Sequence, residues 1–180
     1  MNPWDVIVAA VLLSLERLCY VWIWRAPDVF RFLCAQVPCA WAETPMDVVE
    51  KLFYAFKILQ GVVFLGWCYI YSHGLFWPLA GESWSLGLGG VLLLVGQILN
   101  VSVFWRLGRV GVFYGKRFGY DVSWYNTFPF SFLEHPQYVG ALLSIWGFFL
   151  IMRFPYDDWA VLPLIETVYY VLGAYYERED

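Results

Sequence analysis

The sequence predicts an all-helical integral membrane protein that forms a single domain over residues 1–180 and has about five transmembrane helices. Of the 180 residues, 61% are hydrophobic and only 14% are charged, whereas a soluble domain has about 45–50% apolar and about 25% charged residues. The apolar residues also gather into runs close to the ~20 residues that a helix needs to cross a bilayer. A net charge of −4 and the lack of a basic patch argue against nucleic-acid binding.

Each predicted transmembrane helix is an apolar run between charged or proline-containing stretches. The runs cover residues 4–24, 52–71, 84–105, 137–152 and 159–176. The stretch 26–45 contains three prolines and is therefore expected to be a connecting loop. The last two runs are short and joined by a polar turn, which predicts a hairpin of helices. A four-helix alternative stays open, in which the first run lies in the membrane interface.

Three of these runs contain charged residues. For Glu16 and Arg17 two interpretations are equally open: the two side chains pair inside the protein, or they mark a short or tilted helix near an interface. Lys57 is expected to extend its side chain toward the interface. Glu166, in the last run, needs a polar partner or water.

The third run has no charged residue but contains several glycines. Gly89 and Gly90 lie about two helical turns before Gly96, and small residues at such positions let another helix or a ligand approach the backbone. Gly87-Leu88-Gly89 is not a dinucleotide motif, because no strand precedes it and the third glycine is misplaced.

The distribution of Lys and Arg predicts the orientation in the membrane. These residues flank the stretch 26–45 and crowd residues 106–117, whereas residues 72–83 contain none. Cytoplasmic loops carry the excess of positive residues. The first loop, the polar segment 113–140 and the C-terminus are therefore expected to face the cytoplasm.

The polar segment 113–140 is the candidate functional segment, and it ends in a group of residues suited to chemistry. Glu134 and His135 precede Pro136, which is favourable at the first position of a helix. Free backbone N–H groups at a helix start attract anions. On spacing alone, the interpretation that Pro136 simply begins a helix and His135 is an interfacial histidine is slightly favoured.

Several motifs follow one another in the second half of the chain. They are Gly96-Gln97, Leu107-Gly108, Phe113-Tyr114-Gly115-Lys116-Arg117-Phe118-Gly119, Phe128-Pro129-Phe130 and His135-Pro136-Gln137-Tyr138-Val139-Gly140, with an acidic cluster at the end. Through these motifs residues 96–180 resemble the phospholipid N-methyltransferase family, particularly its short plant-type members. The resemblance implies a methyltransferase that uses S-adenosyl-L-methionine. Its acceptor would be the amine of phosphatidyl-N-methylethanolamine and the dimethyl form, in phosphatidylcholine synthesis in the endoplasmic reticulum.

The resemblance also implies roles for single residues. The cofactor-binding residues would be Gly96, Pro136, Tyr138, Gly140, Glu177 and Glu179. The chain departs from the family pattern at Leu94, which replaces the first glycine of a Gly-x-Gly motif, and at Arg178, which separates two acids. Glu134 and His135 are candidates to accept the amine proton. The candidate substrate-binding residues are Tyr114, Arg117 and Tyr125, the tyrosines by cation–π attraction to the methylated product.

Two other functions stay open. The His-Pro-x-Tyr-x-Gly motif also occurs in isoprenylcysteine carboxyl methyltransferases, which act on prenylated carboxylates. The departures at Leu94 and Arg178 motivate a non-catalytic membrane protein with the same fold. Phe128-Pro129-Phe130 favours the phospholipid enzymes. With two histidines, no metal site is expected, and a homodimer is left open.

Overall fold

The computed structural model describes residues 1–36, 42–72, 82–123 and 125–177, and these residues form helices and no strand. The elements are α1 (Pro3–Arg25), α2 (Pro27–Gln36), α3 (Pro45–Tyr71), α4 (Ser83–Val112), the 3-10 helix η1 (Gly115–Phe118), α5 (Pro136–Met152) and α6 (Val161–Tyr176). The prediction of an all-helical protein is confirmed.

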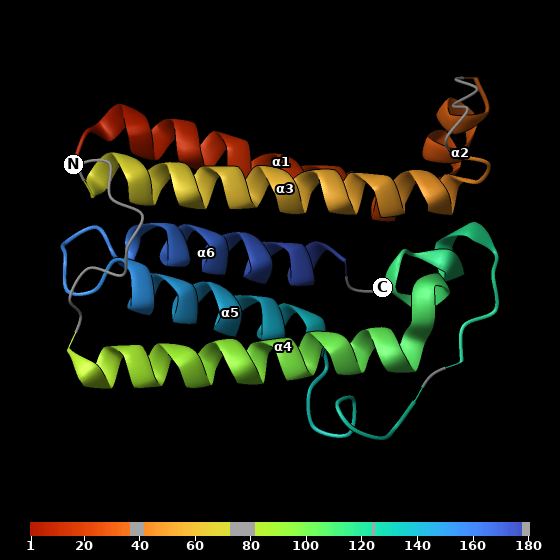
Figure 1. Cartoon of the computed structure of the whole chain (residues 1–180). Helices are drawn as coiled ribbons and strands as arrows, with labels where there is room; N and C mark the ends of the chain where they lie inside the picture. The colour runs from red at the N-terminus through yellow and green to blue at the C-terminus, as the bar shows by residue number, and fades with distance from the viewer. Residues whose placement is uncertain (37–41, 73–81, 124, 178–180) are drawn as a thin grey trace.

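The long helices lie roughly along one direction (Figure 1). In that view the N-terminus, the start of α4 and the connection between α5 and α6 lie at one end, while α2, η1 and the end of α6 lie at the other. α1 packs against α3 and α6, and α5 packs against α4 and α6. The contact between α5 and α6 is the one that the hairpin prediction requires.

Two helices among the described residues are long and apolar enough to cross a membrane. They are Pro3–Arg25 and Ser83–Phe118, with mean hydropathies of 2.0 and 1.9. Pro136–Met152 is a shorter apolar helix. By length and composition, these helices agree with the predicted membrane protein.

Several prolines in the described part of the chain lie at the start of a helix. Thr44 and Asp47 form a capping box around Pro45 at the start of α3, and Pro136 begins α5. Proline suits the first helical turn because its fixed φ is helical and the missing N–H would have no partner there. For the same reason Pro27 begins α2, so the prediction of a loop over residues 26–45 was wrong for Pro27–Gln36.

α4 and α5 approach each other closely through two pairs of glycines. A Cβ atom on Gly96 would lie 2.5 Å from the carbonyl oxygen of Gly140, and one on Gly89 would lie 2.8 Å from that of Gly147. Real Cβ atoms do not make contacts this short, so only glycine fits. The prediction that small residues in this run admit another helix is confirmed, while Gly90 faces open space.

α4 extends past the predicted run 84–105 and kinks at Gly108, whose φ is 61°. Glycine adopts this left-handed region without a steric penalty. After the kink, Arg109 forms ion pairs with Asp47 and Glu50 of α3. The end of α4 is thereby tied to the start of α3, and this contact closes one end of the helix bundle.

A buried ion pair holds the opposite end. Arg153, which is 1% exposed, donates from Nε and Nη2 to Asp158 at 2.8 and 2.5 Å. It also donates from Nη1 to the Ser72 hydroxyl at 2.6 Å, and the Trp67 indole donates to Asp158 at 2.8 Å. The pair therefore joins the end of α3 to the connection between α5 and α6.

Candidate active site

A cavity of about 1450 Å³ lies inside the helix bundle, with lining residues from α1, α3, α4, α5 and α6. Its charged or hydrogen-bonding residues include Glu16, Arg17, Lys57, Gln60, Asn100, Tyr114, Glu134, His135, Tyr138 and Glu177. A cavity with a few convergent polar groups is the usual form of a small-molecule site.

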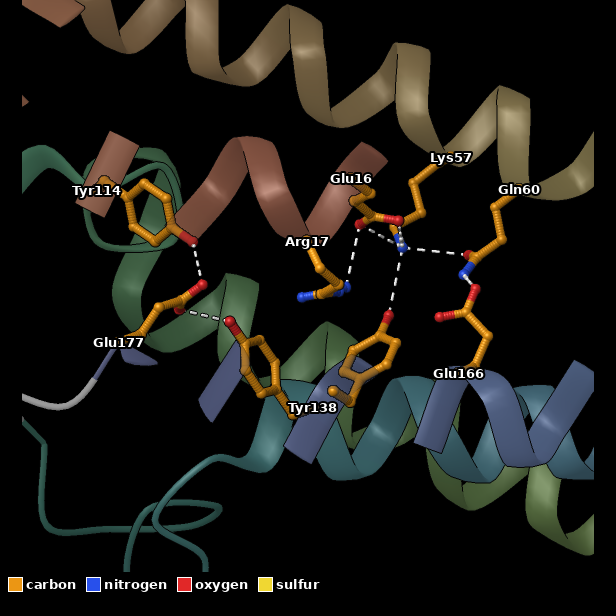
Figure 2. Close-up of polar contacts among 9 residues, drawn as sticks. Glu16, Arg17, Lys57, Gln60, Tyr114, Tyr138, Glu166 and Glu177 are labelled. Carbon is orange, nitrogen blue, oxygen red and sulfur yellow. Dashed lines mark hydrogen bonds and ion pairs between the residues drawn. The ribbon is translucent and has the colours of Figure 1, made fainter. Parts of the chain in front are cut away.

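Glu177 is one polar centre of the cavity, and it follows the last residue of α6. Its carboxylate accepts hydrogen bonds from the phenol of Tyr114 at 3.0 Å and from that of Tyr138 at 2.5 Å (Figure 2). Burial raises the pKa of Glu177, and the phenol hydrogen bonds oppose this shift without cancelling it. The site therefore holds a carboxylate that takes up a proton more readily than an exposed one.

Glu16, Arg17 and Lys57 form a second polar centre (Figure 2). Glu16 and Arg17 are 4% and 7% exposed, and Arg17 Nη2 lies 3.1 Å from Glu16 Oε1. Lys57 Nζ lies 2.9 Å from the same oxygen. Of the two open interpretations, pairing inside the protein is therefore the correct one. The expected orientation of Lys57 was wrong, because its ammonium group turns inward to the buried carboxylate.

Glu166 has the polar partner that the sequence analysis required. The side chain is 1% exposed and accepts a hydrogen bond from Gln60 Nε2 at 2.6 Å. Gln60 Oε1 in turn accepts from Lys57 at 3.2 Å. Gln60 therefore connects Glu166 to the Glu16 centre (Figure 2).

His135 Nε2 and Asn100 Oδ1 are buried without a hydrogen-bond partner, and both residues line the cavity. The imidazole of His135 stacks on the ring of Tyr138, with centroids 5.8 Å apart. A Cβ atom on Gly140 would lie 2.7 Å from Asn100 Oδ1, so this glycine leaves space for the amide. Because buried polar atoms normally have partners, the two atoms are suited to contact a ligand.

The structure brings together several of the predicted site residues. Those that line the cavity are Tyr114, Glu134, His135, Pro136, Tyr138 and Glu177. Two predicted substrate contacts lie elsewhere. The Arg117 guanidinium lies over the ring of Trp24, 3.7 Å from the centroid, and Tyr125 is 38% exposed on the segment before α5.

The glycines of the predicted cofactor site have a different role in the fold. Gly96 and Gly140 face each other in the contact between α4 and α5, and neither is among the cavity-lining residues. Gly96 and Gly140 therefore set how closely α4 and α5 approach each other, and Gly140 also leaves space for the Asn100 amide. Glu179 lies outside the described residues.

Sequence reasoning missed Asn100 and Gln60 as residues of the cavity. Both are amides within apolar runs, and polar groups at such depth usually face the protein interior. That rule could have identified them. Tyr170, which lies under the Arg17 guanidinium at 3.7 Å, has no such signal because the chain has 13 tyrosines.

The fold and the cavity define a class of protein: a helical membrane protein whose bundle contains a cavity lined by polar and ionisable side chains. The comparisons narrow the class. Residues 84–179 match the family model described as phospholipid methyltransferase. Because the match covers more than half of the chain, the protein belongs to this family, and the resemblance that the motifs indicated is confirmed.

Several characterised proteins are similar to this chain. It is 29% identical to the phosphatidyl-N-methylethanolamine N-methyltransferase of Arabidopsis thaliana over 139 residues. These aligned residues make up 77% of this chain and 75% of that protein. The phosphatidylethanolamine N-methyltransferase of Mus musculus is 34% identical over 92 residues, which cover 51% of this chain and 45% of that protein. The phosphatidyl-N-methylethanolamine N-methyltransferase of Saccharomyces cerevisiae is 37% identical over 70 residues, 38% and 34% of the two chains. No solved structure matches this chain.

Proposed function

We propose that this protein transfers a methyl group from S-adenosyl-L-methionine to the amine of phosphatidyl-N-methylethanolamine, and of its dimethyl form, in phosphatidylcholine synthesis. One observation carries the proposal. The segment with the family motif at the start of α5 and the acid after α6 meet in one cavity, through the hydrogen bond from Tyr138 to Glu177. The family match and the names of the relatives support the choice of substrate.

The lining of the cavity suits this methyl donor. S-adenosyl-L-methionine has a cationic amino group, a sulfonium, an adenine amine and ribose hydroxyls. The Glu177 carboxylate can hold the amino group, and Asn100 Oδ1 can accept from an adenine or ribose donor. When bound, the donor supplies an electrophilic methyl group, and the residues of this chain hold and orient the two reactants.

The acceptor amine must lose a proton, because only a neutral amine has a free lone pair. His135 Nε2 has no protein partner and lines the cavity together with Glu134. A positioned imidazole or carboxylate can take such a proton. Glu134 is also exposed to solvent, which suits it to pass the proton to water.

The packing of α1 supports a protein with five transmembrane helices over the four-helix alternative. Glu16 and Arg17 are buried by the contacts of α1 with α3 and α6, and this packing favours an α1 that crosses the membrane with the bundle over one that lies in the interface. With the Lys and Arg distribution, this arrangement favours a cytoplasmic C-terminus. The proposed location is the endoplasmic reticulum, as in the family.

Methyl incorporation by purified protein in lipid nanodiscs tests the proposal. With a radiolabelled donor, label in phosphatidyl-N-methylethanolamine is the expected result. Label in a prenylcysteine analogue instead would identify a carboxyl methyltransferase. No incorporation, together with no donor binding by calorimetry, would identify a non-catalytic protein.

A further inference from the structure

Arg17 has hydrogen-bond donors that the protein leaves unused at the wall of the cavity. Its side chain is 8% exposed, its Nη2 donates to Glu16, and its Nε is buried without a partner. A guanidinium has five N–H donors in a planar fork, and two of them can bind one carboxylate or phosphate group. Arg17 can therefore bind an oxyanion that enters the cavity.

The orientation of Arg17 is fixed by aromatic rings from two other helices. The guanidinium lies 3.7 Å from the ring centroid of Tyr170 on α6 and 5.2 Å from that of Tyr138 on α5. An arginine over an aromatic face keeps its N–H groups free at the edge of its plane. These rings therefore hold the guanidinium in place without using its donors.

The charges around Arg17 also leave room for an anion. Arg17 and Lys57 both contact the same carboxylate oxygen of Glu16, so this group of three carries one net positive charge. The two other nearby acids have polar partners of their own: Glu166 accepts from Gln60, and Glu177 accepts from Tyr114 and Tyr138. Because a charge in an apolar segment is costly without a counter-ion, an anion in the cavity would balance the group.

Arg17 lies at a boundary between two parts of the cavity. Glu177 and His135 line its polar part, near the end of α6 and the start of α5. Phe64 lies about two turns beyond Lys57 on α3, and Phe148 lies almost three turns beyond Tyr138 on α5. The Phe64 and Phe148 rings stack 6.0 Å apart and make the deeper lining apolar.

We propose that Arg17, supported by Glu16 and Lys57, binds the phosphodiester of the lipid substrate. The inference rests on the proposed function and adds a headgroup subsite to it. A phospholipid has its amine, phosphodiester and acyl chains in the same order as the polar lining, the Arg17 group and the apolar lining. The carboxylate of the methyl donor is another oxyanion with suitable chemistry, but it has no apolar chain to match the lining beyond Arg17.

Two substrates of equal chain length test the proposal with the full chain in phosphatidylcholine nanodiscs. One is phosphatidyl-N-methylethanolamine, and the other has a neutral carbonate ester in place of the phosphodiester. Their kcat/KM ratio is compared for wild type, Arg17→Gln and Arg31→Gln. In Arg17→Gln, Lys57 still pairs with Glu16. Arg31 is an exposed arginine of α2 outside the cavity and is the matched control.

For wild type and Arg31→Gln, kcat/KM should be about ten- to a hundredfold higher for the phosphodiester substrate than for the carbonate. This ratio corresponds to the contribution of hydrogen bonds to a charged group. Arg17→Gln should lose most of this preference, while the Kd of S-adenosyl-L-methionine stays unchanged at an alkaline pH that keeps Glu177 ionised in both proteins, because Arg17 lowers the pKa of Glu177. If Arg17→Gln keeps the wild-type preference for the phosphodiester substrate, the proposal is wrong. If the Kd of the donor rises instead, Arg17 binds the donor carboxylate.

A competition experiment on the wild type covers the case in which Arg17→Gln does not fold. Short-chain phosphatidylglycerol, which has the phosphodiester but no amine, should inhibit methylation competitively, and diacylglycerol of the same chains should not. Equal inhibition by phosphatidylglycerol and diacylglycerol would contradict the proposed phosphodiester subsite. A wild-type protein that methylates neither phosphatidyl-N-methylethanolamine nor its carbonate analogue contradicts the proposed function itself.

Discussion

Tyr138, in the first turn of α5, donates a hydrogen bond of 2.5 Å to Glu177, the residue that follows α6. The two residues are separated by 39 positions in the chain. Tyr114, after α4, donates to the other oxygen of the same carboxylate. The ends of three helices thus converge on one acid in the cavity.

Glu177→Gln should weaken binding of S-adenosyl-L-methionine about tenfold, which corresponds to the loss of one hydrogen bond to a charged group. Burial raises the pKa of Glu177, so this carboxylate becomes protonated, and loses its attraction for a cation, at a higher pH than an exposed one. Wild-type affinity should therefore fall as the pH is lowered from neutral to mildly acidic values. Calorimetric titration at several pH values measures this, and the variant should show a flatter profile.

Tyr138→Phe should move the loss of affinity to a higher pH. The phenol hydrogen bond stabilises the carboxylate form and opposes the effect of burial on the pKa of Glu177. Without it, the carboxyl group holds its proton up to a higher pH. The same titrations measure the shift. Tyr175→Phe, an exposed tyrosine on α6, is the control, and an equal change in both variants would contradict the assignment.

Gly96→Ala and Gly140→Ala should each lower the free energy of unfolding by about 1–3 kcal/mol, because a methyl group does not fit between α4 and α5. Gly90→Ala, on the open face of α4, should leave stability unchanged or slightly improved, since alanine favours helix. Thermal unfolding in detergent compares the three variants. Equal stability in all three would show that the glycine contact is not important for the fold.

Glu134→Gln and His135→Asn separate the two candidates for the proton acceptor. The variant that removes the acceptor should reduce turnover most at acidic pH and least at alkaline pH, where more of the amine is already neutral. Initial rates across pH, at saturating donor, give this profile. A uniform loss over the whole range would assign the residue to positioning of a reactant.

Arg153→Met should destabilise the protein by about 3–5 kcal/mol, because it leaves Asp158 charged and buried without its partner. The double variant Arg153→Met/Asp158→Leu should recover part of this loss. Thermal unfolding of the single and double variants measures the coupling. Methyl-donor affinity of the folded fraction should not change, because both residues lie in the connection between α5 and α6, whereas Glu177 follows the other end of α6.

The features that the sequence could predict are local. Apolar runs and the residues at their ends depend on neighbours in the chain, so the helical fold and the start of α5 at Pro136 were predictable. α2 was not, because a helix-starting proline and a loop proline look alike in a stretch of mixed polarity. The kink at Gly108 was not predicted either.

Side-chain partners depend on which helices become neighbours, and this information is not local. Lys57 and Glu16 are 41 positions apart, and from hydropathy alone Lys57 could point either way. Tyr138, Glu177 and Tyr114 meet in the structure, although the motifs placed the first two among the cofactor candidates and Tyr114 among the substrate candidates. The motifs gave no means to separate Tyr114, in the cavity, from Arg117 and Tyr125, which lie outside it.

The cavity has walls from both parts of the chain, although the family model covers only residues 84–179. A fragment that starts at residue 84 would retain Glu177, His135 and Asn100 but would have no α1 or α3 wall. If the first two long helices select the lipid, a chimera that exchanges them between relatives would change acceptor preference and keep donor affinity. Substrate range could then evolve by changes in α1 and α3, while the residues proposed to bind the methyl donor stay under separate selection.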